Sequence, residues 1–405
     1  MRVLMINTEP GWRGGENQLL LLVTGLARRI QTVTACRAGG ELERRLLLNG
    51  AITSAMHGSG GFGFRGVMKL RKLLSGSPGF DLVHAHTSHA HGLACWALLG
   101  KTIPLLVTRR VDFPVGRSQI GRWKYRRPER LIAVSDCVRR VLGDGGVPAE
   151  KITVIRDGVD PARLGGGEDG AGALRAEFGI PATAVVFGIT AHLTDHKDHR
   201  TLLRAFAIVE SRLPDAWLLI AGGGELEAEL RQLAVDLGLQ RTRFLGFRTD
   251  IATVLACLDV FVLSSHHEGL GSAVMDAMFR GLAVVATTAG GIPELVTPGH
   301  DGLLVPPRDS VALAGALMVV GNDPAERARL GAHARATAAA RFGATRMVAE
   351  HVALYREVLA DHSIGAAGAA GAAGAAGAAG AAGAAGAAGA AAAAGVATAA
   401  QGSAP

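Results

Sequence analysis

The sequence predicts an α/β protein built from two doubly wound parallel sheets. Strand-like apolar segments alternate with helical segments in both halves of the 405 residues, which is the order that produces parallel sheets. A glycine-rich stretch at 158–172 separates the two series and indicates a flexible boundary. The chain is long enough for two domains with a core each. Ligands of such sheets bind at the carboxyl ends of the strands.

The first half contains six predicted strands, and a glycine turn at Gly11–Gly15 leads from the first of them into a helix. The strands are expected at Arg2–Asn7, Ile30–Cys36, Asp81–His84, Leu105–Thr108, Leu131–Val134 and Ile152–Ile155. The helices are expected at Glu16–Arg29, Gly40–Leu48 and His89–Leu99, and Ser135 is placed to cap another. We assign residues 1–165 to this first domain.

The second half repeats the pattern, and we assign residues 166–345 to it. Its strands are expected at Ala184–Thr190, Trp217–Ile220, Thr242–Leu245, Leu258–Ser264 and Ala283–Thr287. Its helices are expected at Thr201–Arg212, Glu225–Leu237, Ile251–Ala256 and from Ser272 to a stop at Gly281. A last helix, Val348–Ala360, falls within 346–363, and we expect it to return toward the first domain.

The end of the chain, residues 364–405, is of low complexity. From Gly365 a Gly-Ala-Ala unit repeats with a period of three and then passes into an alanine run. Glycine at every third position is typical of collagen, but the repeat has no proline. Without aromatic or β-branched residues it cannot form a packed core. We therefore expect a disordered tail.

One stretch, Ser264–Glu294, combines a strand, a polar turn and a helix. The turn contains Glu268 and two glycines, and the helix that follows carries Asp276. The unpaired N–H groups and the dipole of the helix favour an anion in such a turn. An ordinary βαβ unit with tight glycine turns would have the same glycines. The carboxylate at Glu268 favours a ligand site, because beside an anion it would be unfavourable unless it bound a hydroxyl or a cation.

Charge is distributed unevenly along the chain. Residues 1–165 hold 25 Lys and Arg against 12 Asp and Glu, and the remainder holds 17 against 23, which agrees with the net charge of +7. The densest basic stretch, Arg117–Arg130, also contains Trp123 and Tyr125. Cations with interleaved aromatic rings suit an anionic lipid surface or single-stranded nucleic acid, although a solvated face would have the same composition. We expect a membrane surface and no nucleic acid.

The chain lacks the features of secreted or membrane-spanning proteins. The N-terminal residues have no apolar signal-peptide core, and the folded portion has no run of 18 uncharged apolar residues. The four cysteines are scattered and fit neither a disulfide framework nor a metal site. These features predict a cytoplasmic protein, with peripheral contact at the inner face of the cytoplasmic membrane as a further expectation.

The motif at 268–294 resembles a known family signature. E-G-L-G-S-A-V-M-D-A-M, followed by G-L-A-V-V-A-T and G-G-I-P-E, is similar to the glutamate-x7-glutamate motif of retaining nucleotide-sugar glycosyltransferases of the GT-B fold, the bacterial group 1 family (glycosyltransferase family 4-like). The resemblance covers roughly residues 1–360 and implies two Rossmann-like domains facing a cleft. It places Glu268 at the transferred sugar. It places Asp276, a shorter acid than the family's glutamate, at the ribose.

Further residues match the family pattern on both halves of the chain. His86 in D-x-x-H-x-H corresponds to a histidine beside the donor sugar, whereas His84 is more typical of a packed or capping residue. Lys197 corresponds to a lysine on the diphosphate, and His192 stands where the family has an arginine. The other implied donor residues are Gly15, Phe247, Gly269, Gly271, Ser272 and Ala273. Arg109 and Arg110 follow a strand and could meet an anionic acceptor, and Glu294 matches a family position or serves a structural turn.

Four histidines between His84 and His91 raise the alternative of a zinc site. No cysteine or acid completes a ligand set there, and the chain has no D-x-D motif near the site. We therefore expect no metal and no cofactor.

The resemblance implies retaining, metal-independent transfer of a sugar from a UDP- or GDP-linked donor. The expected acceptor is a glycan or a lipid-linked intermediate of envelope polysaccharide or lipopolysaccharide synthesis. Two other classes stay open at this point. One is a nucleotide-sugar epimerase or a phosphorylase of the same fold. The other is a non-enzymatic basic protein that binds anionic lipid or RNA.

Overall fold

The structure is a computed structural model that describes residues 1–56, 63–116 and 118–364. Met1–Ala353 forms one compact unit, which contains both sheets, and a second unit begins at Leu354. Arg117, the first residue of the basic stretch, and the Gly/Ala repeat from 365 onward lie outside the described residues. The predicted disordered tail therefore stays a prediction.

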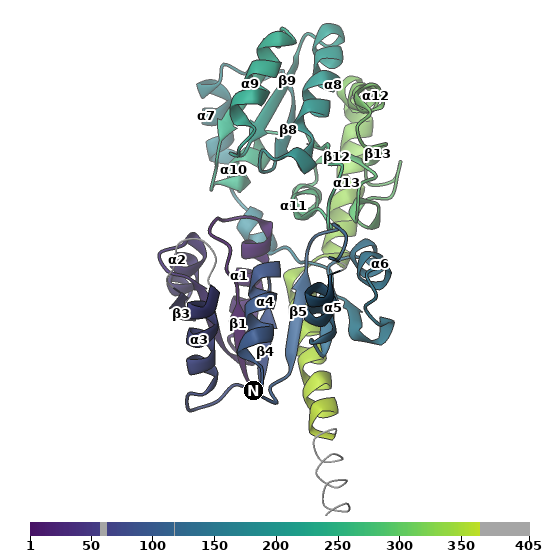
Figure 1. Ribbon diagram of the computed structural model, residues 1–405. Coiled ribbons are helices and arrows are strands. Elements are labelled where there is room, and N and C mark those ends of the chain that lie inside the picture. Colours follow the sequence, from purple (N-terminus) through teal and green to yellow (C-terminus); the bar gives the residue numbers. More distant parts are fainter. Residues whose placement is uncertain (57–62, 117, 365–405) are drawn as a thin grey trace, which may run out of the picture. The chain divides into compact units, whose positions relative to one another are not determined.

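The first sheet has seven parallel strands in the order β3-β2-β1-β4-β5-β6-β7 (Figure 1). The strands are β1 (Arg2–Ile6), β2 (Gln31–Arg37), β3 (Ile52–Met56), β4 (Leu82–Ala85), β5 (Leu105–Arg109), β6 (Arg130–Ala133) and β7 (Ile152–Val154). Its helices are α1 (Gly14–Leu26), α2 (Glu41–Leu48), α3 (Gly63–Leu74), α4 (Ser88–Ala97), α5 (Gln119–Arg126) and α6 (Asp136–Asp144). Short 3-10 turns follow at Ala149–Lys151 and Pro161–Leu164.

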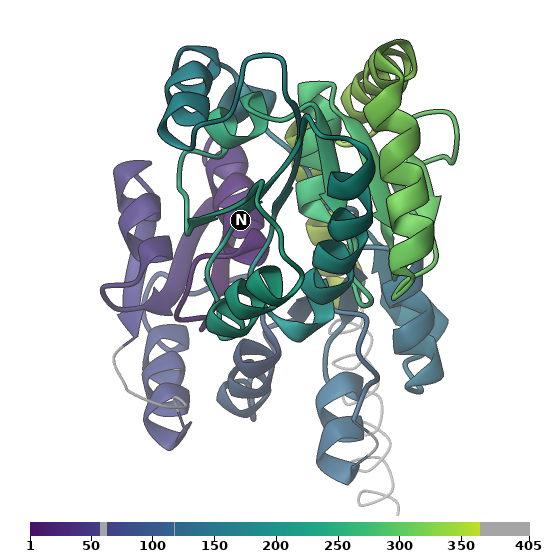
Figure 2. The same ribbon diagram turned by 90° about the horizontal axis from the view of Figure 1, so that it is seen from above.

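The second sheet has six parallel strands in the order β10-β9-β8-β11-β12-β13. The strands are β8 (Val185–Thr190), β9 (Ala216–Ala221), β10 (Thr242–Gly246), β11 (Val260–Leu263), β12 (Ala283–Thr287) and β13 (Leu303–Val305). Its helices are α7 (Glu168–Glu177), α8 (His199–Arg212), α9 (Glu227–Asp236), α10 (Ile251–Ala256), α11 (Ser272–Arg280), α12 (Ser310–Asn322) and α13 (Pro324–Arg341). Short 3-10 turns occur at Asp195–Lys197 and Ile292–Glu294. The light-green helices α12 and α13 pack on each other beside β12 (Figure 2).

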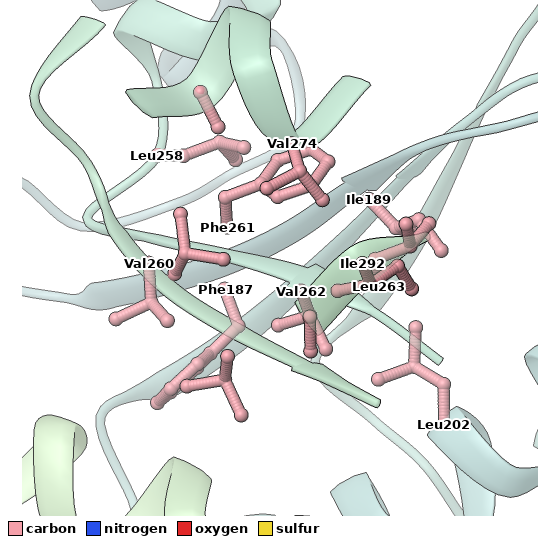
Figure 3. Packing of buried hydrophobic residues seen from close by; sticks show 14 of the residues in the cluster. Phe187, Ile189, Leu202, Leu258, Val260, Phe261, Val262, Leu263, Val274 and Ile292 are labelled. Carbon is pink, nitrogen blue, oxygen red and sulfur yellow. The ribbon is translucent and has the colours of Figure 1, made fainter. Parts of the chain in front are cut away.

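The core of the second sheet forms around β11, the strand that leads into the Ser264–Glu294 stretch. Its four residues are all buried, which explains why it is a continuous apolar run rather than an alternating one. Figure 3 shows Phe261 on the side of Val274 from α11, whereas Val260 lies beside Phe187 of β8, its partner in the strand register. Burying side chains of this size stabilises the fold by about 1.5–3 kcal/mol each. The strand therefore fixes the start of the turn firmly.

Sequence reasoning missed several elements at the margins of the sheets. It proposed no strand at β3, an edge strand that is mostly half-buried and shows little hydrophobic contrast, and no helix at α3. It also missed β13, α7, α12 and α13. The predicted last helix is real, and it extends over 344–364. Within the first unit, Val348 of this helix packs against Gly25 of α1.

Candidate functional site

The predicted site residues lie at the points where strand order reverses in the two sheets. In the first sheet β1 lies between β2 and β4, and in the second β8 lies between β9 and β11. Loops leave such neighbouring strands in opposite directions and open a ligand site between them. Gly15 and His86 follow β1 and β4, whereas Lys197 and Glu268 follow β8 and β11.

The start of α11 is an open helix N-terminus. Its cap position is Gly271, with φ of +102°, so no side chain occupies the end of the helix. The start of α1 lies directly against it, because a Cβ added to Gly14 would come within 2.8 Å of Ser272 Oγ. Ser272 therefore lies beside the glycine loop that carries Gly15, and Gly269, Gly271 and Ala273 lie within three residues of it in the chain. The open end of α11 suits a negatively charged group. The first turn of α1 already holds a carboxylate, because Glu16 Oε2 accepts from the N–H of Arg13 at 3.0 Å.

Lys197 and Glu268 form an ion pair across the β8–β11 switch point. The Nζ of Lys197 donates to Glu268 Oε2, and the two side chains are 19% and 13% exposed. Ser265 Oγ also donates to Glu268 Oε2 at 3.3 Å, and Ser264 Oγ donates to the carbonyl of Lys197 at 2.9 Å. The structure thus brings together one predicted sugar-binding residue and one predicted phosphate-binding residue.

Two glycines permit close backbone approach around Glu268. Gly290 has φ of +52°, and a Cβ on it would lie 1.7 Å from the carbonyl oxygen of Glu268. A Cβ on Gly269 would lie 2.0 Å from the carbonyl oxygen of Arg110, which belongs to the first sheet. A side chain at either position would displace the turn. The turn therefore packs directly on the loop that follows β5.

His86 lies in a buried polar cluster at the carboxyl end of the first sheet. Its Nδ1 is 3.5 Å from Arg110 Nη1, and Arg110 Nε donates to Asp157 Oδ1 at 3.2 Å. Burial, followed by the neighbouring His84, Arg110 and His351, holds the pKa of His86 well below its usual value, so the ring is neutral. Its Nε2 is buried and has no hydrogen-bond partner among the described residues.

His84 is a packed residue, as its position in the strand suggested. It is fully buried, and its Nε2 is 2.7 Å from Thr108 Oγ1. Burial, with help from His351 and Arg110, also lowers its pKa well below the usual value.

Arg109 requires a correction. Sequence reasoning placed it against an anionic acceptor, but its side chain is buried and fully engaged within the protein. Its guanidinium donates to the carbonyls of Val111 and Phe113 and to the hydroxyl of Tyr125. These bonds shape the loop after β5. Arg110 lies nearer the site, beside Gly15 and His86, but it too is occupied by Asp157.

Three further residues, Asp276, His192 and Phe247, were predicted to bind the donor. Asp276 accepts a hydrogen bond from Arg163 Nη2 at 2.6 Å, so a ribose would have to compete with that arginine. Burial is the main cause that raises the pKa of Asp276. Burial, then Arg13 and Lys197, lowers the pKa of His192, so this ring adds no permanent charge where the family has an arginine. Phe247 is exposed beside Gly223.

Three side chains, those of Ser135, Glu294 and Asp112, link the loops of the two sheets through hydrogen bonds that were not predicted from the sequence. Ser135 Oγ donates to the carbonyl of Gly269 at 2.6 Å. Glu294 accepts from the backbone N–H groups of Asp136 and Cys137 at 2.9 Å each, and from Arg156 at 2.7 Å. Asp112 accepts from the N–H of Glu268 at 3.1 Å. Only the cap position of Ser135 and the G-G-I-P-E motif around Glu294 offered a local signal.

Two further observations concern metal binding and membrane-spanning helices. Among residues 1–56, 63–116 and 118–364, no three His, Cys, Asp or Glu side chains gather closely enough to hold a metal ion. Over the same ranges, every helix is too short or too polar to cross a bilayer.

Comparison with known proteins defines the class and then the family. The GT-B fold expected from sequence is confirmed. The structure of HepE from Anabaena in complex with UDP-glucose superposes with a TM-score of 0.78 and 25% identity, over 89% of this chain and 100% of that one. Residues 172–337 match the glycosyl transferases group 1, and residues 12–163 match glycosyltransferase family 4. The chain belongs to the group 1 glycosyltransferase family.

Curated relatives agree with this assignment. The D-inositol 3-phosphate glycosyltransferase of Saccharomonospora viridis is 31% identical over 70% of this chain and 72% of its own length. The lipopolysaccharide core biosynthesis glycosyltransferase LpsE of Rhizobium meliloti is 35% identical over 42% of this chain. The match with LpsE spans about half of that relative, 48% of its length.

Proposed function

We propose that the protein transfers a sugar, with retention of anomeric configuration, from a nucleoside-diphosphate sugar to a glycan or lipid-linked acceptor. The observation that carries this proposal is the meeting of Lys197 and Glu268 beside the open N-terminus of α11. A cation, free helix amides and a carboxylate are the groups that a diphosphate and a sugar hydroxyl require at one place. UDP-glucose is the donor to test first, since HepE was crystallised with it.

The proposed chemistry follows from the charges at the site. Departure of the nucleoside diphosphate develops negative charge, which the Lys197 ammonium and the amides at the start of α11 would stabilise. The diphosphate would take Lys197 from its present partner, and the freed Glu268 carboxylate would accept from the sugar hydroxyls and offset positive charge at the reacting carbon. The unpartnered Nε2 of His86 offers a further hydrogen bond to the sugar. A neutral imidazole can supply this bond without charge.

The acceptor proposal rests on the relatives. LpsE acts in lipopolysaccharide core biosynthesis, by its name. We propose an envelope glycan or its lipid-linked precursor as the acceptor class of this chain.

A panel of nucleotides tests the donor proposal. Thermal shift with UDP, GDP, ADP and CDP, followed by hydrolysis of the matching nucleotide sugars, should single out one base and release its nucleoside diphosphate. Stabilisation by none of them, at concentrations up to millimolar, would remove the proposed function. Conversion of a nucleotide sugar into its epimer, with no acceptor present, would support the epimerase alternative instead.

We propose in addition that the helix after β5 contacts an anionic membrane surface. No residue of α5 is buried, Ile120 is strongly exposed, and the rings of Trp96 and Trp123 lie 5.0 Å apart. Arg122 and Arg126 are exposed, whereas Arg127 donates to the carbonyl of Leu98. Cations beside an exposed apolar side chain suit the boundary between lipid headgroups and acyl chains.

Vesicle sedimentation tests this contact. Arg122→Glu with Arg126→Glu should lower binding to vesicles containing phosphatidylglycerol, and added salt should have the same effect. Arg200→Glu, on α8 of the second sheet, reverses a charge elsewhere and should leave binding unchanged. Equal binding by wild type, the double variant and Arg200→Glu would exclude α5 as the membrane-binding surface.

A further inference from the structure

The loop after β5, residues 110–116, contacts the turn that carries Glu268 and so links the first sheet to that turn. Arg109 fixes its course by donating to the carbonyls of Val111 and Phe113. These two residues are 41% and 42% exposed. The side chain of Asp112, between them, is 8% exposed. The loop therefore holds one carboxylate inward, toward the second sheet.

Asp112 makes two contacts with the residues at the turn. Its Oδ2 accepts from the backbone N–H of Glu268 at 3.1 Å and lies 3.1 Å from Nδ1 of His267. The imidazole of His267 also lies against the ring of Phe113, with centroids 5.3 Å apart. On the other side of Glu268, the backbone of Gly269 packs on the carbonyl of Arg110. The loop thus fixes the main chain on both sides of Glu268.

We propose that Asp112 is a positioning residue for Glu268. The backbone N–H of Glu268 lies outside any helix or strand, so this carboxylate supplies a bond that no secondary structure provides. A hydrogen bond from an N–H to an ionised carboxylate is stronger than a bond between neutral groups. Loss of it would let the Glu268 main chain shift, and a shift of about 1 Å at a reacting group can reduce the rate about 100-fold.

This role couples the two sheets, because the group that holds Glu268 comes from the sheet that does not carry it. The Glu268 carboxylate is aligned only when the β5 loop meets the turn. The inference rests on the proposed function of Glu268. The experiment must therefore distinguish an error in the role of Asp112 from an error in the proposed function.

Two substitutions at Asp112 separate the hydrogen bond from the charge. Asp112→Ala removes the acceptor, whereas Asp112→Asn keeps an oxygen that can accept from the same N–H. Asp259→Ala is a matched control, since Asp259 Oδ2 accepts from the backbone N–H of Val186 at 2.8 Å, where β8 begins. Asp259→Ala removes a hydrogen bond from a backbone N–H to a carboxylate at the amino ends of the strands, away from the Glu268 turn.

The readouts are hydrolysis of UDP-glucose, UDP affinity and hydrogen exchange of residues 265–271. Asp112→Ala should lower kcat about 10- to 100-fold with KM changed less than about threefold, and should speed exchange in 265–271. Asp112→Asn should restore kcat to within about threefold of wild type. Asp259→Ala should lower the melting temperature but leave kcat unchanged.

Several results would overturn the role. A kcat for Asp112→Ala equal to that of Asp259→Ala would do so, as would an equal loss in Asp112→Ala and Asp112→Asn. Unchanged exchange in 265–271 would show that Asp112 does not hold the turn. If wild-type protein neither binds UDP nor hydrolyses UDP-glucose while another nucleotide succeeds in the panel, the same assay is run on that donor. If none succeeds, the proposed function fails, and the effect of Asp112 on the reaction fails with it, while hydrogen exchange in 265–271 still tests whether Asp112 holds the turn.

Discussion

The carboxyl ends of the two sheets share a topology but differ in how their polar groups are partnered. At the first sheet, His86 and Asp157 are buried, and Arg110, whose side chain is 13% exposed, contacts both of them. At the second sheet, the side chains of Lys197 and Glu268 contact each other and are 19% and 13% exposed, so the two sites differ in their partners more than in their exposure. Arg110 is held by an aspartate of its own sheet, whereas a diphosphate could replace the partner of Lys197. The same fold therefore holds the polar cluster of His86, Arg110 and Asp157 in fixed contacts at the first sheet. At the second sheet it provides the Lys197–Glu268 ion pair, which a ligand could replace.

The strongest test of this difference is Glu268→Ala. We expect loss of about 100-fold or more in sugar transfer or donor hydrolysis, a magnitude typical of groups that stabilise developing charge. UDP affinity should not weaken, because removal of the carboxylate frees Lys197. Equilibrium titration with UDP and initial rates with UDP-glucose measure the two effects. Unimpaired hydrolysis by a folded variant would place the chemistry elsewhere.

Lys197→Ala should have the next largest effect. Removing a charged donor from the diphosphate should raise the Kd for UDP about 10- to 150-fold, as hydrogen bonds to charged groups are worth about 1.5–3 kcal/mol. Lys197→Arg should keep part of the affinity, because it keeps the charge but not the shape of the ammonium. Calorimetric titration measures both. An unchanged Kd in Lys197→Ala would mean that another group holds the diphosphate.

The buried histidines at the carboxyl end of the first sheet should make the stability of the protein sensitive to acid. Burial is the main cause that lowers the pKa of His84, His86 and His351, the last to about 4. Above pH 6.5 these rings are neutral in both states. Below it the unfolded chain binds protons that the folded chain excludes, so the free energy of unfolding falls by up to about 1.4 kcal/mol per pH unit for each ring.

Urea unfolding at pH 7.5 and pH 5.5 measures this loss of stability. His351→Gln should reduce the difference between the two pH values. His300→Gln changes an exposed histidine and should leave the difference as in wild type. A His351→Gln protein with the wild-type difference would contradict the burial of a neutral ring.

The smallest expected effect concerns His192. Because burial, Arg13 and Lys197 lower the pKa of His192, His192→Arg adds a permanent cation near Lys197. We expect the Kd for UDP to decrease about threefold, less than a full charge-assisted bond since the two cations repel each other. Weaker binding in this variant would indicate that the position does not face the diphosphate.

The contrast between the sheets also explains what the sequence could predict. The Glu268 turn and the Lys197 loop are short, continuous segments, so their strands, glycines and charges were visible as local patterns. Their place in one donor site was implied by the family resemblance, whereas the pairing of β8 with β11 is seen only in the structure. The predicted GT-B architecture is confirmed, although the edge strand β3 was missed because half-buried strands show little hydrophobic contrast.

Contacts between distant segments could not be predicted in this way. Asp112 and Glu268 are far apart in sequence and meet only because both sheets fold and dock. Arg109 was assigned to an acceptor because it follows a strand as Arg110 does. The structure shows that neighbouring arginines point in different directions, one into the β5 loop and one toward His86.

The central claim is that the donor nucleotide binds at the carboxyl ends of the second sheet. Hydrogen exchange with and without saturating UDP tests it most directly. The account predicts slower exchange in residues 192–198 and 266–273, with no change in α3 or α5. Protection confined to α3, α4 or α5, with residues 266–273 unaffected by bound UDP, would contradict it.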